Sequence, residues 1–306
     1  MSAVCDWVWQ AVAVHSLVCV MFFHVASYLP STPMTHQDLD CAAPAVVPAP
    51  TPISYSEHDG VRFLHFAGAE DCTQGAILLS EPDRLLLPYA QQMMAWLLFL
   101  DPTQLADAHV AQLGLGPGSL TGFCYRKLPE ARVTAVEINP LVIEAARTAF
   151  HLPPDDHRLQ VLAQDALDWV MDPARQGTVD ALQVDVYDGV HDGSPTLQSL
   201  AFYRACRQVL RAPGVMAINL HCSNEGFGRN MERICEVFDY RVLMFPITMV
   251  ENTIALAFNG PTLTVEWAAL QARAEALQST FGLPTADWIE GLRRANPHQQ
   301  GSVLTL

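Results

Sequence analysis

From residue 110 onward, short apolar runs alternate with longer stretches whose apolar residues recur at helical spacing. The apolar runs predict strands at 110–113, 133–136, 158–162, 179–184 and 215–220, followed by an antiparallel pair at 242–247 and 254–258. The amphipathic stretches predict helices at 140–150, 197–210 and 225–238, with one or two more within 261–294. Such alternation predicts a three-layer α/β fold.

The regions on either side of this core carry weaker patterns. Residues 53–80 hold short alternating or apolar runs around turn residues and predict a small antiparallel sheet. Residues 88–100 have the length and apolar spacing of a core helix, which Asp101 and Pro102 would end. We expect the chain after its last helix to form a loose tail.

A glycine-rich turn follows the first core strand. Gly114, Gly116 and Gly118 form a G-x-G-x-G turn, where the lack of side chains lets the backbone approach a ligand closely. The dinucleotide fingerprint G-x-G-x-x-G would place a glycine at Ser119, so the pattern does not favour a dinucleotide. We therefore expect these glycines to bind a different nucleoside cofactor.

Acidic residues follow the second and third core strands. Glu137 ends the second strand, where a carboxylate can accept hydrogen bonds from both hydroxyls of a ribose. Asp165 stands just past the third strand, with Ala166 beside it, and can accept a hydrogen bond from the exocyclic amine of adenine. Together with the glycine turn, these residues predict an adenosine pocket without phosphate ligands.

The fourth core strand is followed by Asp185 and Asp188. Open α/β sheets bind ligands at the edge where their strands end. An acid there can hold an ammonium group or take a proton from it, so that a neutral amine attacks an electrophilic carbon. Asp185 is our candidate for the proton acceptor, whereas Asp188, beside Gly189, is equally consistent with a turn or a helix cap.

Composition narrows the function classes. Half of the 306 residues are hydrophobic, which suits one catalytic unit with an appendage. The net charge of −15 and the single lysine, Lys127, argue against a nucleic-acid surface, and an acidic protein attracts cationic substrates. The eight cysteines show neither a C-x-x-C pair nor zinc spacing, so we expect reduced thiols, a cytoplasmic protein and no metal.

The first 52 residues include an apolar stretch at 7–29. Because no Lys or Arg precedes Arg62, the basic region of a signal peptide and the basic flank of a membrane helix are both missing, and a membrane anchor is not expected. Translation from Met34 remains an alternative. We expect a dispensable or disordered extension at 1–52, a β element and connecting helix at 53–101, a nucleoside-binding catalytic domain at 102–260, and C-terminal helices and a tail at 261–306.

The order of these motifs resembles that of the polyamine synthases, the family of spermidine and spermine synthases, over about residues 53–258. The matching features are the small N-terminal sheet, the glycine turn, Glu137-Ile138-Asn139, the acid after the third strand, the D-x-x-D at 185–188 and FYRACRQVLRAPGV at 202–215. The resemblance implies a class I methyltransferase-like (Rossmann-like) three-layer sandwich with a mostly parallel seven-stranded sheet and a small N-terminal antiparallel β element.

The resemblance also implies an activity, the transfer of an aminopropyl group from decarboxylated S-adenosylmethionine to a small cationic amine, with release of methylthioadenosine. On this interpretation Glu137 holds the ribose and Asp165 the adenine, while Asp185 accepts a proton and Asp188 binds the substrate nitrogen. Many members of the family are dimeric, so a homodimer is expected.

Two further pocket residues come from the same resemblance. Gln74 is similar in position to a glutamine that lines the pocket of the family, and Tyr89 matches the tyrosine of a Tyr-His pair near the start of the next helix. Both are candidate substrate-binding residues. An ordinary loop glutamine and a packed aromatic remain the alternative interpretations.

The chain also departs from the family pattern. Pro117 stands where spermidine synthases carry an aspartate that helps hold the aminopropyl amine, Ala90 replaces the family histidine, and Gly189 replaces a proline. These departures leave two alternatives open. One is a methyltransferase that uses intact S-adenosylmethionine, and the other is a nonenzymatic nucleoside-binding protein.

Overall fold

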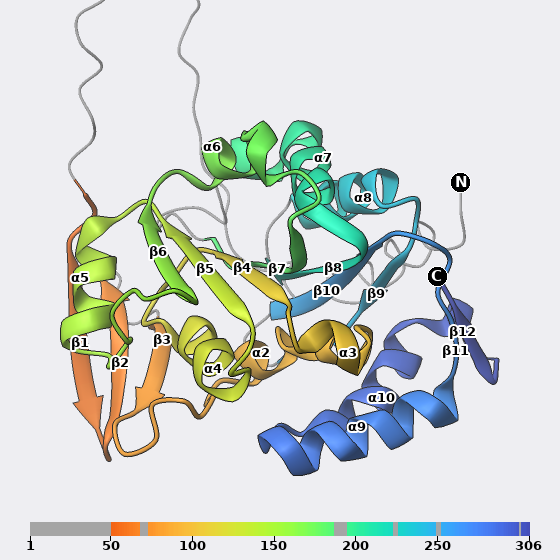
Figure 1. The fold of residues 1–306 in the computed structure, drawn as a ribbon, viewed down its shortest axis with the longest axis horizontal. Helices are drawn as coiled ribbons and strands as arrows, with labels where there is room; N and C mark the ends of the chain where they lie inside the picture. Colours follow the sequence, from red (N-terminus) through yellow and green to blue (C-terminus); the bar gives the residue numbers. More distant parts are fainter. Residues whose placement is uncertain (1–49, 68–72, 187–194, 223–225, 249–251, 300) are drawn as a thin grey trace, which may run out of the picture. The chain divides into compact units, whose positions relative to one another are not determined.

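The computed structural model describes residues 50–67, 73–186, 195–222, 226–248, 252–299 and 301–306. Its contacts group Thr51–Leu306 into one unit, which Figure 1 shows as a central sheet with helices on both faces. Among the described residues, no helix combines the length and the apolar character needed to cross a membrane.

The central sheet has the order β6-β5-β4-β7-β8-β10-β9 within the described residues. Neighbouring strands are parallel from β6 to β8, and β10 runs antiparallel to both β8 and β9. The predicted mostly parallel seven-stranded sheet of a class I methyltransferase-like fold is therefore confirmed. The strands are β4 (His109–Leu113), β5 (Arg132–Glu137), β6 (Leu159–Ala163), β7 (Val179–Val184), β8 (Leu210–His221), β9 (Val242–Met244) and β10 (Asn252–Asn259).

Helices cover both faces of the sheet, and every residue of the inner strands β4 and β7 is buried. On one face, α6 (Ala166–Met171), α7 (Leu200–Val209) and α8 (Phe227–Val237) lie side by side (Figure 1). On the other, α4 (Ser119–Lys127) shares a hydrophobic core with α9 (Trp267–Phe281) and α10 (Thr285–Ala295). The predicted C-terminal helices are thus confirmed as two.

A small antiparallel sheet precedes the core, as predicted. It consists of β1 (Ile53–His58), β2 (Val61–Phe66) and β3 (Thr73–Leu78). Asp59 and Gly60 connect the first two strands with φ angles of 50° and 75°, the backbone of a tight two-residue hairpin. Leu64 and Ile77 of this sheet pack in one cluster with residues of α5 (Pro140–Thr148), which fixes the sheet beside the central domain.

The segment expected to form one helix at 88–100 instead contains two short ones. They are α2 (Pro88–Gln92) and the 3₁₀ helix η1 (Ala95–Leu98), separated by Met93 and Met94. Residues 93–98 are almost completely buried, so packing on all sides determines their backbone rather than an amphipathic helical face. Asp101 does not end a helix but begins α3 (Pro102–Leu105), where its side chain accepts a hydrogen bond from the Thr103 amide at 2.8 Å.

The C-terminal end and the stretch before α7 also differ from the prediction. The end is not a loose tail, because β12 (Val303–Thr305) pairs with β11 (Thr264–Glu266) and buries Leu304. The helix expected at 197–210 begins with the 3₁₀ helix η3 (Pro195–Gln198) before α7, and β8 starts at Leu210 instead of residue 215. In both places, pairing with a neighbouring strand forms more strand than the sequence predicts. The partner of β12 is β11, and the partners of β8 are β7 and β10.

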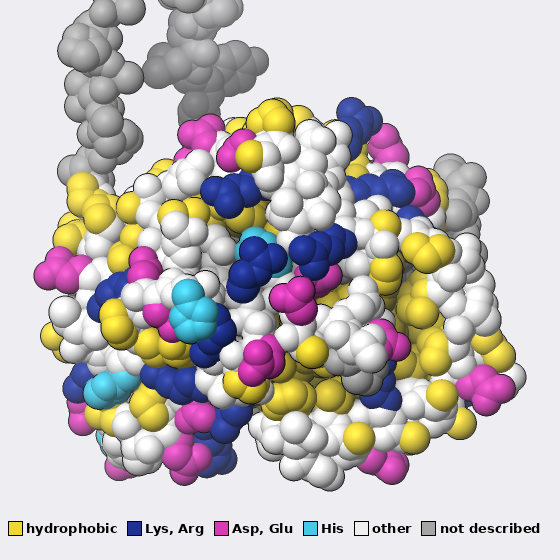
Figure 2. All heavy atoms as spheres, in the orientation of Figure 1, with side chains coloured by type: hydrophobic (Ala, Val, Ile, Leu, Met, Phe, Trp, Pro, Cys, Tyr) yellow, Lys and Arg dark blue, Asp and Glu magenta, His cyan; other side chains and the backbone are white. Residues whose placement is uncertain are grey.

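The surface carries charges of both signs. Figure 2 shows Lys and Arg side chains standing among Asp and Glu side chains on the face in view. Several are paired, for example Lys127 with Asp83 at 2.6 Å and Arg207 with Asp239 at 2.7 Å.

Candidate active site

A cavity of about 230 Å³ opens where β4, β5 and β7 end. The strands β5 and β7 flank β4 on opposite sides. The chain runs from β4 through β5 to β6 and then crosses back to β7, so the direction in which strands are added reverses at β4. Open α/β sheets bind ligands at such a switch point. The cavity brings together most of the predicted site residues, namely Gln74, Tyr89, Gly114, Gly116, Glu137, Asp165, Ala166 and Asp185.

The glycine turn forms one wall of the cavity. Gly114, Gly116 and Gly118 all have positive φ angles, at 82°, 54° and 80°. A Cβ atom at Gly114 would come within 2.1 Å of the carbonyl oxygen of Asp185, so only glycine fits there. Gly118 precedes α4 and faces Leu152 instead of lining the cavity, so it shapes the turn from outside.

Pro117 is part of the same wall. Its ring packs against β3, because a Cβ atom added at Gly75 would lie 2.5 Å from the Pro117 Cδ. The turn therefore presents an uncharged ring to the cavity at this position.

Glu137 ends β5 and is held between the glycine turn and α5. Its Oε2 accepts a hydrogen bond from the Leu115 amide at 3.0 Å, and its Oε1 accepts one from the Asn139 amide at 2.8 Å. Burial raises the pKa of the Glu137 carboxyl, and these backbone hydrogen bonds oppose that rise by stabilising the charged form. Because each carboxylate oxygen can accept more than one hydrogen bond, this fixed group can still bind a diol in the cavity.

Asp165 caps α6. Its Oδ1 accepts hydrogen bonds from the Leu167 amide at 2.7 Å and the Asp168 amide at 3.1 Å, which fixes its rotamer. This capping role comes in addition to the ligand binding that the sequence predicts. Since the residue also lines the cavity beside Ala166, capping and ligand binding are compatible, with Oδ2 left to accept a hydrogen bond from a ligand.

Asp185 directly follows β7. Its backbone amide donates to the Leu113 carbonyl at 2.9 Å, which places it beside the glycine turn. Its Oδ1 accepts a hydrogen bond from Nδ2 of Asn219 at 2.9 Å. Burial raises the pKa of the Asp185 carboxyl, and the hydrogen bond from Asn219 acts in the opposite direction. Asp188, the other predicted acid after this strand, lies outside the described residues.

Three side chains at this site were not expected from the sequence. Gln112, buried in β4, donates from Nε2 to the Gly114 carbonyl at 2.6 Å and accepts a hydrogen bond from the Thr121 hydroxyl, so it braces the turn. Ile138 lines the cavity directly after Glu137. Asn219 supports Asp185. Gln112 and Asn219 are polar residues within apolar strands, and that interruption is the signal that would have identified them.

The carboxyl groups of the cavity suit nucleoside binding and the acceptance of a proton. Two carboxylates fixed by backbone amides offer acceptors for the hydroxyls and the amine of a nucleoside. A third carboxyl at the same cavity, Asp185, has a pKa that burial raises and offers a proton acceptor. No group of three or more His, Cys, Asp or Glu side chains in the described part of the chain could hold a metal ion.

Comparisons with known proteins place the chain among enzymes that share this fold, although no family model matches it. It is 33% identical over 262 residues to a polyamine aminopropyltransferase of Chromobacterium violaceum, covering 85% of this chain and 96% of the relative. A probable spermidine synthase from Corynebacterium glutamicum superimposes with a TM-score of 0.61 at 16% identity, covering 78% of this chain and 91% of that one. Human methyltransferase-like protein 13, in complex with SAH, superimposes with a TM-score of 0.58 at 26% identity. The match covers 64% of this chain and 93% of that one.

Proposed function

Because the chain belongs to the polyamine aminopropyltransferase family, we propose that it transfers an aminopropyl group from decarboxylated S-adenosylmethionine to a small cationic amine. The observation that carries the proposal is the convergence of Glu137, Asp165 and Asp185 on one cavity in a chain so similar to these enzymes. In the reaction, the amine nitrogen attacks the propyl carbon next to the sulfonium, the carbon–sulfur bond breaks, and methylthioadenosine leaves.

The nucleoside half of the donor fits the acids at β5 and β6. We assign the ribose hydroxyls to Glu137, whose two oxygens are already oriented by the Leu115 and Asn139 amides. We assign the exocyclic amine of adenine to Asp165. The glycine turn between them lets the donor approach the backbone, and Ala166 and Ile138 offer apolar contacts to the base.

Asp185 is the proposed proton acceptor. An amine is mostly protonated in water at neutral pH and must lose a proton before its nitrogen lone pair can attack carbon. A carboxyl whose pKa is raised by burial accepts that proton more readily than an ordinary aspartate does. Gln74 and Tyr89 line the same cavity and are proposed contacts for the amine, with Asp188 as its further ligand on the strength of the resemblance.

A second candidate function is methyl transfer from intact S-adenosylmethionine. The observation that favours it is Pro117, because the wall it forms offers no charge to a free propylammonium group. Methyltransferase-like protein 13 in complex with SAH is 26% identical to this chain, which makes the same nucleoside scaffold compatible with both reactions.

The two functions differ in the nucleoside they release. The full chain is incubated with a pool of di- and polyamines and either decarboxylated or intact S-adenosylmethionine, and the nucleoside products are separated by chromatography. We expect methylthioadenosine from the decarboxylated donor, at a rate that depends on the amine. S-adenosylhomocysteine from the intact donor would assign the chain to methyl transfer, and neither product despite nucleoside binding would contradict both.

A further inference from the structure

Two asparagines stand in line behind Asp185. Asn219 lies in β8, next to β7, and donates from Nδ2 to Asp185 Oδ1 at 2.9 Å. Asn252 begins β10 and donates from Nδ2 to Asn219 Oδ1 at 2.9 Å. The backbone of Asn252 is fixed in turn, since its amide donates to the Thr248 hydroxyl at 3.1 Å and its carbonyl accepts from the Thr248 amide at 2.7 Å. The chain of amides thus spans three strand ends.

The direction of these hydrogen bonds determines what Asn219 presents to Asp185. An amide side chain has a donor end and an acceptor end, and rotation by half a turn exchanges them. Asn252 donates to Asn219 Oδ1, and the donor end of Asn219 faces Asp185. A donor at that place favours the ionised carboxylate, which is the form that can accept a proton.

The position of the pair is also informative. Neither Asn219 nor Asn252 lines the cavity, whereas Asp185 does. Among the described residues, Asn219 is the one side chain that hydrogen-bonds to the Asp185 carboxylate, and it occupies Oδ1. The other oxygen, Oδ2, is left for a group in the cavity.

We infer that Asn219 and Asn252 are positioning residues for Asp185, which orient its carboxylate and keep it ready to accept a proton from the amine. The inference rests on the proposed function, because it gives Asp185 the role of proton acceptor there. It adds that Asn252 orients Asn219 and that Asn219 orients Asp185, through hydrogen bonds outside the cavity. Substrate does not need to touch either amide.

Asn219 differs from the titratable groups around Asp185 in its direct hydrogen bond to the carboxylate. Glu137, Asp165 and Tyr89 line the same cavity, and His221 pairs with Asn252 in the register of β8 and β10. Within the described residues, the Asp185 carboxylate is hydrogen-bonded by Asn219 and not by any of these four groups. A change in the ionisation of Asp185 on removal of Asn219 is therefore attributable to the lost amide.

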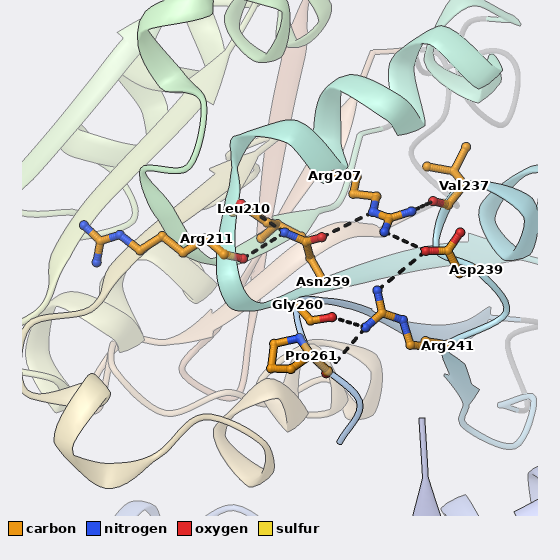
Figure 3. A network of polar contacts seen from close by, with 9 residues as sticks. All are labelled: Arg207, Leu210, Arg211, Val237, Asp239, Arg241, Asn259, Gly260 and Pro261. Atoms are coloured by element: carbon orange, nitrogen blue, oxygen red, sulfur yellow. Dashed lines mark hydrogen bonds and ion pairs between the residues drawn. The ribbon is translucent and has the colours of Figure 1, made fainter. Parts of the chain in front are cut away.

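The chain contains a matched control for the experiment. Asn259 lies at the other end of β10, and its amide is also fully engaged, as Figure 3 shows. Its Oδ1 accepts from Arg207 Nε at 3.2 Å, and its Nδ2 donates to the Arg211 carbonyl at 2.9 Å. Replacement of Asn259 by Leu removes comparable hydrogen bonds from the same strand without touching Asp185.

The test compares Asn219→Leu, Asn252→Leu and Asn259→Leu in the full chain. The first measurement is the pH dependence of unfolding for each variant, alone and combined with Asp185→Asn, because the difference reports the titration of Asp185 without any turnover. The second is the pH dependence of kcat/KM for aminopropyl transfer. Leu keeps the approximate size of Asn but donates and accepts nothing.

We expect Asn219→Leu to move the Asp185 titration and the acid limb of the rate profile to higher pH, lowering kcat/KM on that limb about tenfold, the effect of losing one hydrogen bond to a charged group. Asn252→Leu should shift both in the same direction by less, and Asn259→Leu should shift neither. If Asn219→Leu fails to fold, the Asp185 titration in Asn252→Leu still tests the inference. An Asp185 titration unchanged in both variants would overturn the inference, whereas a shifted titration in a protein without aminopropyl transfer would support it and reject the proposed function instead.

Discussion

Replacement of Asp185 by Asn separates the catalytic role of this carboxyl from its effect on stability. Asn has nearly the same shape and can still accept a hydrogen bond from Asn219 through its Oδ1. It cannot accept a proton from the amine at any relevant pH. Loss of a positioned general base typically lowers a rate by about 10²- to 10⁴-fold, so we expect kcat to fall by that factor, equivalent to roughly 3–5 kcal/mol of activation free energy.

The same substitution should increase stability at neutral pH. Burial raises the pKa of the Asp185 carboxyl in the folded protein above its value in the unfolded chain. The folded protein therefore binds more protons between those two pKa values, and its stability falls as pH rises through that interval. Asn does not titrate, so the variant escapes this loss, by about 1.4 kcal/mol for each pH unit by which burial raises the pKa.

Asp180 at the start of β7 provides the matched control. It is buried and accepts hydrogen bonds from the His109 amide and from Arg211, both at 2.8 Å, at the end of the strand away from the cavity. Asp180→Asn should lower the unfolding free energy by about 1.5–3 kcal/mol, the range for a hydrogen bond to a charged group, and leave kcat unchanged.

The assay is a pH series of steady-state kinetics together with denaturant unfolding of the wild type and both variants. The expected pattern is a slower, more stable Asp185→Asn variant and a less stable Asp180→Asn variant with normal kcat. An Asp185→Asn protein with wild-type kcat across the pH series would refute the assignment of the base. A loss of stability in that variant at neutral pH would refute the account of burial.

Two further substitutions test the nucleoside part of the site. Glu137→Gln should raise the KM for the donor about tenfold or more, with a smaller change in kcat. The reason is that a hydrogen bond to a charged acceptor is lost in the ground state and the transition state alike. Glu144→Gln, on the exposed face of α5, should change neither KM nor kcat. Gly114→Ala should abolish donor binding in a thermal-shift titration and destabilise the fold, since its Cβ would collide with the Asp185 carbonyl at 2.1 Å, and retained binding would contradict that geometry. Gly177→Ala, at a φ of 63° with nothing within 4 Å of its Cβ, should lower stability by only about 1–2 kcal/mol from backbone strain.

The sequence was most informative where local chemistry and tertiary structure agree. Apolar runs identified the central strands because these strands are buried on both faces and need no alternation. The helix predicted from residue 140 begins there as α5, with Pro140 at its first position and the Asn139 side chain accepting a hydrogen bond from the Leu141 amide at 3.0 Å. The acids at strand ends could be placed in one cavity because parallel strands all end at the same edge of the sheet.

The failures arise where long-range packing determines the backbone. Nothing local in 88–100 distinguishes one continuous core helix from the succession of α2 and η1, whose conformation depends on the sheet and α9 that surround it. Leu304 gave no sign of a strand because its partner, β11, lies far away in the sequence. Asn219 does interrupt an apolar strand, but its role could not be predicted from that signal alone, since it depends on Asp185, a residue of another strand.

The most direct test of aminopropyl transfer follows the transferred group itself. The full chain is given decarboxylated S-adenosylmethionine with an isotope label in its propyl carbons, together with a single diamine, and the amine product is identified by mass spectrometry. The account predicts an amine enlarged by one labelled aminopropyl unit, formed in step with unlabelled methylthioadenosine and lost in Asp185→Asn. An amine enlarged by a methyl group instead, or donor consumption with the label absent from every amine, would contradict it.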